Sequence, residues 1–178
     1  MAYLLIACRT LLLGVFVAAL AGKIRRRSTY RDFAKWVGTL GLVPRRLTAI
    51  AAASATAAEA AAVALLALPS TVPVGFALAA ALLAVFTAGV ALAIRRGRRA
   101  PCHCFGASKT PLGAVHVVRN AVLLAVGCAG LTLSTVGDPD PAIHLAGVLL
   151  AVTVALLALL PVLRLDDLMA LFTTRSEI

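Results

Sequence analysis

The sequence predicts an all-α polytopic membrane protein, with a four-helix transmembrane bundle followed by a fifth, C-terminal transmembrane helix. Three observations predict this class. The 178 residues are 62% hydrophobic and 13% charged, with a mean hydropathy of +1.01, whereas a soluble domain carries about 25% charged residues. The apolar residues form blocks of roughly twenty, the length that crosses a ~30 Å hydrocarbon layer as a helix. The basic residues gather at the ends of these blocks.

Residues 1–178 are expected to form one integral membrane domain. The apolar blocks predict spans at about 3–21, 47–68, 74–94, 116–136 and 143–163. No positive residue precedes the first block and a basic run follows it, so we expect a retained helix and not a cleaved signal peptide.

An amphipathic, basic segment over about residues 29–42 separates the first two spans. Phe33, Trp36, Val37 and Leu40 recur at helical spacing on one face of this segment. A basic helix with a tryptophan on its apolar face is typical of the headgroup layer of a membrane. The same pattern fits a helix that packs beneath the bundle, and the sequence leaves both positions open.

Lysine and arginine residues predict the orientation and the surroundings of the chain. The segments 23–46 and 95–115 are rich in them, whereas the turns 69–73 and 137–141 contain none. This asymmetry predicts an N-terminus outside and a C-terminus in the cytoplasm. We therefore assign the net charge of +10 to contact with the headgroups of the lipid bilayer and exclude nucleic acid as a partner. The alanine- and arginine-rich composition indicates a bacterial cell membrane.

The segment with the clearest chemistry is Cys102-His103-Cys104, which follows a run of arginines after the third span. Nearby cations favour the reactive thiolate form of cysteine, and a disulfide that closes so small a ring is strained and labile. A closed zinc site needs about four ligands, and of the other possible ligands only His116 is near in sequence. The spacing favours a redox pair with no metal, while a zinc-bound or purely structural Cys-His-Cys clip remains the alternative.

The other two cysteines, Cys8 and Cys128, lie in the outer parts of the first and fourth spans. They form a candidate second redox pair that would pass electrons across the bundle. Free cysteine is also an ordinary small apolar residue within a helix, so the sequence leaves a packing role open.

Glu59 lies within the second span, where an ionisable group is costly and indicates function by default. We expect it to face the bundle interior, where it is either protonated or paired, with Arg9 and Arg119 as candidate partners. It then handles protons or holds helices together, and both roles fit. His116 and His144 stand at helix ends and are expected to be interfacial residues, not ligands.

Residues at several positions together match a known pattern. An arginine and a phenylalanine lie in the first span, a lysine stands at its end, a proline precedes the second span, a glutamate lies within it, and Cys-x-Cys-Phe-Gly follows the third. These residues are Arg9, Phe16, Lys23, Pro44, Glu59 and Cys102–Gly106. With them, residues 4–135 resemble the methylamine-utilisation MauE family, which is related to the DoxX-like membrane proteins. The chain departs from that family at His103, where glycine is common, and in having alanines after Glu59.

The resemblance implies a four-helix membrane core that handles thiols and disulfides beside a thioredoxin-like partner. We therefore expect a membrane thiol–disulfide oxidoreductase or redox-maturation factor in which Cys102 and Cys104 exchange disulfides with that partner or with a client thiol protein. Its oxidant or reductant is either a quinone or another thiol protein. The alternative is a non-catalytic membrane assembly partner with a Cys-His-Cys clip. A proton-coupled carrier centred on Glu59 is less favoured, because no inverted repeat is evident.

Overall fold

The computed structural model describes residues 1–25, 27–41, 43–97, 113–136 and 144–173, and in these ranges the chain is helical, without strands. Five of the described helices are long and apolar enough to cross a membrane, which confirms the predicted all-α membrane class. The helices, in chain order, are α1 (Ala2–Ile24), α2 (Arg27–Leu40), α3 (Thr48–Ala67), α4 (Val72–Arg95), α5 (Ala114–Val136) and α6 (Leu145–Thr173). Short 3₁₀ turns, η1 (Arg45–Leu47) and η2 (Pro69–Thr71), precede α3 and α4.

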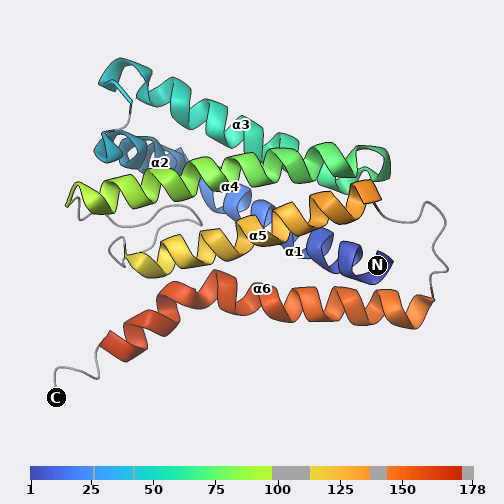
Figure 1. Ribbon diagram of the computed structural model, residues 1–178. Coiled ribbons are helices and arrows are strands. Elements are labelled where there is room, and N and C mark those ends of the chain that lie inside the picture. Colours follow the sequence, from blue (N-terminus) through green and yellow to red (C-terminus); the bar gives the residue numbers. More distant parts are fainter. Residues whose placement is uncertain (26, 42, 98–112, 137–143, 174–178) are drawn as a thin grey trace.

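Helices α1, α3, α4 and α5 form a four-helix bundle in which each helix packs against two others (Figure 1). α1 contacts α3 and α5 on one side of the bundle, and α4 contacts the same two helices on the other. Large apolar side chains from all four helices fill the space between them, namely Leu12, Val15, Phe16, Leu66, Phe76, Leu83 and Leu123. This core occupies the middle of the bundle and the end at which α1 begins and α3 ends.

Small residues let the helices of the bundle approach closely, as is common where helices pack within a membrane. A side chain added at Gly75 of α4 would place its Cβ 2.9 Å from the backbone nitrogen of Leu66 in α3. Gly130 of α5 lies against the ring of Phe76 in α4. The bundle interfaces therefore depend on backbone contact at these points.

Helix α2 packs against the helices of the bundle, chiefly α3 and α1, and its place relative to the headgroup layer stays a prediction. Phe33 and Trp36 on its apolar face are almost fully buried against Ala52 of α3 and Ala93 of α4. The two rings stack with their centroids 6.0 Å apart. Protein therefore covers the apolar face of α2, while its charged face stays exposed.

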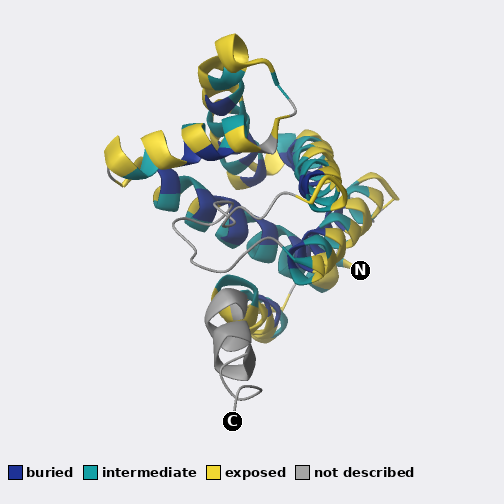
Figure 2. Cartoon of the chain, turned by 90° about the vertical axis from the view of Figure 1, so that its left-hand side faces the viewer, coloured by how far each residue is buried: buried dark blue, intermediate teal, exposed yellow. Residues whose placement is uncertain are grey.

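Helix α6 packs against α1, to one side of the four-helix bundle (Figures 1 and 2). Leu159 of α6 lies against Gly14, and the backbone N–H of His144 donates a hydrogen bond of 2.9 Å to the hydroxyl of Tyr3. Most of the described α6 surface is exposed, as the yellow residues in Figure 2 show, which suits contact with lipid.

Two helices run beyond the spans that the sequence predicts. α1 continues to Ile24 and so includes Lys23, which the sequence interpretation placed in the first cytoplasmic connection. α6 continues to Thr173, beyond the predicted end at 163, and passes through Pro161. Good helix formers follow Arg164, so the helix propagates into the polar tail, and it bends in its C-terminal part (Figure 1), as a proline within a helix predicts.

The close contact at Gly75 generates a stability prediction. Gly75→Ala should lower the free energy of unfolding by about 1–3 kcal/mol, because the backbone of α3 must move to admit the methyl group. Gly127→Ala is the matched control, since its Cβ would meet Ala80 at an ordinary 3.5 Å. Denaturant titration of both variants in detergent measures the difference, and equal effects would contradict the close α3–α4 contact.

Candidate functional site

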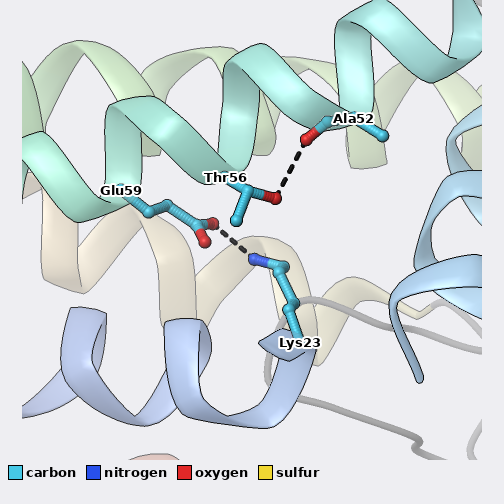
Figure 3. A network of polar contacts seen from close by, with 4 residues as sticks. All are labelled: Lys23, Ala52, Thr56 and Glu59. Carbon is cyan, nitrogen blue, oxygen red and sulfur yellow. Dashed lines mark hydrogen bonds and ion pairs between the residues drawn. The ribbon is translucent and has the colours of Figure 1, made fainter. Parts of the chain in front are cut away.

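The candidate site is built around an ion pair inside the bundle, between Lys23 of α1 and Glu59 of α3. The ammonium group Nζ of Lys23 donates a hydrogen bond to Oε1 of Glu59 (Figure 3), and each side chain is only 1% exposed. Taking two charges out of water is costly, and their attraction in a medium of low dielectric offsets that cost only with good geometry. Such a pair is therefore a strong candidate for a functional role.

The offset between α1 and α3 brings the two charges together. Lys23 lies in the last turn of α1, whereas Glu59 lies past the middle of α3. Because η1 and the first half of α3 extend beyond the end of α1 (Figure 1), the centre of α3 is level with that end. The predicted first span ended at about residue 21 and left Lys23 in the basic segment after it, so the sequence interpretation missed this pairing.

Aromatic side chains surround the ammonium group of Lys23. Its Nζ lies 4.6 Å from the ring centroid of Phe33 in α2 and 5.7 Å from that of Phe86 in α4. A cation over an aromatic face is stabilised by the ring quadrupole, more so when it is desolvated. The hydroxyl of Thr56, near the ion pair, donates a hydrogen bond of 2.9 Å to the carbonyl oxygen of Ala52, one turn earlier in α3 (Figure 3).

A small cavity of about 20 Å³ adjoins the ion pair and is lined by Lys23, Glu59 and Asn120, among others. The second carboxylate oxygen of Glu59, Oε2, is buried and has no hydrogen-bond partner among the described residues. A water molecule needs about 10–15 Å³ and two or more polar partners. The cavity meets both needs, so it suits a water that accepts or delivers a proton at Glu59.

Neither partner expected for Glu59 pairs with it. Arg9 instead donates from Nε to the carbonyl of Leu66, at 2.6 Å, and from an Nη nitrogen to that of Ala67, at 2.8 Å. These carbonyls end α3, where the helix has no further N–H groups to bond them. Arg9 therefore ties the N-terminal half of α1 to the C-terminal end of α3. Arg119 is buried near the start of α5, and the ion pair of Glu59 is made by Lys23.

The first turns of α5 carry a buried polar face that the sequence interpretation recognised only in part. His116, Arg119 and Asn120 are 4%, 6% and 2% exposed, so His116 is not the interfacial residue expected. Asn120 lines the cavity beside Lys23 and was missed. An amide next to Arg119 in an apolar block was the available signal, because polar side chains within a span usually face the bundle interior.

The two described cysteines lie in different surroundings. Cys8 is buried in the core of the bundle, Cys128 is exposed on α5, and both are free thiols; their action as a second redox pair stays a prediction. Cys102, His103 and Cys104 lie outside the described residues. The helices on either side of them are described. Just after α4, Arg96 donates a hydrogen bond of 3.3 Å to the carbonyl oxygen of Gly41, just after α2. Near the start of α5, Asn120 lines the cavity beside the ion pair.

The fold and the buried pair define a multi-pass α-helical membrane protein with a polar site in its bundle. A sequence model of the family described as methylamine utilisation protein MauE matches residues 1–133, and the chain belongs to that family. The match ends within α5, so α6 lies beyond it. No curated protein and no solved structure gives a match. In the described part of the chain, no group of three or more potential metal ligands occurs.

The buried pair generates a second prediction. Lys23→Met and Glu59→Met should each lower the free energy of unfolding by about 3–5 kcal/mol, because each leaves one buried charge without its partner. The double variant should lose less than either single variant, since no isolated charge remains. A double-mutant cycle by denaturant titration measures this coupling.

Lys35→Met is the control for that cycle, because Lys35 lies on α2 and is exposed. Its effect should stay within about 0.5 kcal/mol. If Lys23→Met were as mild as Lys35→Met, the ion pair would not hold α1 and α3 together.

Proposed function

We propose that the protein is a membrane thiol–disulfide oxidoreductase in which Cys102 and Cys104 exchange disulfides with a thioredoxin-like or client protein. The observation that carries the proposal is the Cys-x-Cys pair itself, placed directly after a run of arginines in a chain of the MauE family. Neighbouring cations favour the thiolate, and the thiolate is the nucleophile in disulfide exchange.

The exchange runs in two steps. A thiolate of the client attacks the Cys102–Cys104 disulfide, forming a mixed disulfide and releasing one cysteine of the pair as a thiolate. The second client thiolate then attacks the mixed disulfide, so that the client gains an internal disulfide and both cysteines of the pair are reduced. Two electrons pass from the client to the pair, and the same steps reversed would reduce a client.

The described structure supports this proposal through the ends of α4 and α5. The cysteine segment joins these two helices in the sequence. Arg96, just after α4, donates to the carbonyl of Gly41, just after α2. Asn120 near the start of α5 lines the cavity beside the ion pair, at the same end of the bundle. Exposed arginines at this end, among them Arg45, Arg46, Arg95 and Arg96, fit an anionic partner surface or lipid headgroups. A soluble partner would meet the pair at the membrane boundary.

The proposal predicts that Cys102 and Cys104 cycle between thiol and disulfide in cells. Acid quenching followed by a mass-tagged maleimide should show both states, with the reduced fraction rising after dithiothreitol and falling after diamide. Cys102→Ser or Cys104→Ser should abolish the cycle and trap a mixed disulfide with the partner. Cys128→Ser, which removes an exposed free thiol, is the matched control and should leave the cycle intact.

Permanent reduction of the pair under every oxidant condition would overturn the proposal. A zinc ion bound at about one per chain and lost in Cys104→Ser would instead establish the structural clip. Comparing permeant with impermeant maleimides also reports the face on which Cys104 lies, for which the charge distribution predicts the cytoplasmic side.

A further inference from the structure

An apolar groove of about 160 Å³ lies between α2, α3 and α4, near the buried ion pair. Its lining includes three aromatic side chains, Phe33, Trp36 and Phe86. It also includes small residues, among them Ala51, Ala55 and Gly89. An apolar cavity of about 150 Å³ takes up one benzene molecule, so the groove has room for a single flat ring.

Part of the groove's lining is exposed on the surface of an apolar, membrane-length helix. Val85 of α4 contributes to its lining and is 67% exposed, and α4 is one of the spans apolar enough to cross the membrane. Ala51 and Ala55 on α3 are partly exposed. A molecule dissolved in the lipid can therefore reach the groove without passing through water.

The groove and the ion-pair cavity share one wall. Phe33, Trp36 and Phe86 line both spaces, and the ammonium group of Lys23 lies over two of these rings. A ring in the groove would be separated from the ammonium group of Lys23 by these aromatic side chains. The other side of the aromatic wall holds the carboxylate of Glu59, whose Oε2 has no hydrogen-bond partner among the described residues, and a space large enough for a water.

A ligand suited to both spaces is flat, apolar and lipid-soluble, and it gains from a nearby cation and a proton source. A quinone has these properties. Its ring is flat and apolar. Its reduction adds negative charge, which an apolar medium disfavours, and the reduced ring then takes up protons. Lys23 would stabilise that charge, since Coulomb attraction is strong at low dielectric. Glu59 and a cavity water would deliver protons. A lipid acyl chain fills the groove equally well but makes no use of this polar wall.

We propose that the groove between α2, α3 and α4 binds the ring of a lipid-soluble quinone, which reoxidises the reduced cysteine pair. This inference rests on the proposed function for its electron donor. The two thiols of Cys102 and Cys104 form a disulfide and release two electrons and two protons. The quinone takes up two electrons and two protons and becomes a quinol, so atoms and electrons balance. The direction of the client reaction is then oxidation.

The chain carries its own probe, because Trp36 is the single tryptophan and lines the groove. In the purified full-length protein in detergent, decylubiquinone should quench Trp36 fluorescence saturably. Decanol, which has the same chain and no ring, should neither quench the signal nor displace the quinone. Lys23→Met should keep the quenching but slow quinol formation by the prereduced protein, an effect that loss of the fold would not mimic.

Filling the groove should remove the quinone. Ala55→Leu should raise the quinone concentration for half-quenching at least about tenfold, which is about 1.4 kcal/mol. Ala53→Leu is the matched control, because Ala53 is exposed on the same helix and does not line the groove; it should leave that concentration unchanged. Ala51→Leu is a second filling variant, and unchanged Trp36 emission without ligand shows that each variant is folded.

Quenching that does not saturate, that decanol reverses, or that both filling variants leave unchanged would overturn the quinone site. Cysteines that cycle in a protein without saturable quenching would overturn this site alone. Saturable quenching in a protein whose cysteines never cycle would overturn the thiol chemistry and leave the ring site supported. The fluorescence titration and the thiol assay thus separate the two proposals.

Discussion

The contact between Lys23 and Glu59 is the constraint on which the rest of the structure depends. Both charged side chains are only 1% exposed, so the helices that carry them must hold their relative offset or leave a charge isolated in an apolar interior. That offset fixes where α3 begins relative to α1. It also leaves room beneath α3 for α2, whose Phe33 ring completes the surroundings of the ammonium group.

A buried ion pair is weak evidence for stability, since apolar residues of similar volume often fold as well or better. Here the pair is accompanied by features that stability does not require. One oxygen of Glu59 has no hydrogen-bond partner among the described residues, and a space of about 20 Å³ adjoins the ion pair. An apolar groove shares the aromatic residues Phe33, Trp36 and Phe86 with that space. These features together favour a role in binding or proton transfer for the ion pair over a purely structural contact between helices.

The sequence was sufficient for the helical class, the number of spans and the amphipathic segment, because apolar block length and helical periodicity are local properties of a chain. The partner of Glu59 was not predictable in this way. Lys23 read as a solvated charge at a helix end, and only the packing offset of α1 and α3 makes it a buried residue. The aromatic groove combines residues from α2, α3 and α4, so no single stretch of sequence displays it. Asn120 was visible in the sequence but was not recognised.

Helix α6 lies beyond the region that matches the family, and it is attached chiefly to α1. With α6, the number of candidate membrane spans among the described residues is odd. Four crossings return a polypeptide to the side of the membrane on which it started, whereas a fifth crossing delivers whatever follows α6 to the opposite side. A helix that contributes little to the interior thus decides which aqueous phase receives the residues after it.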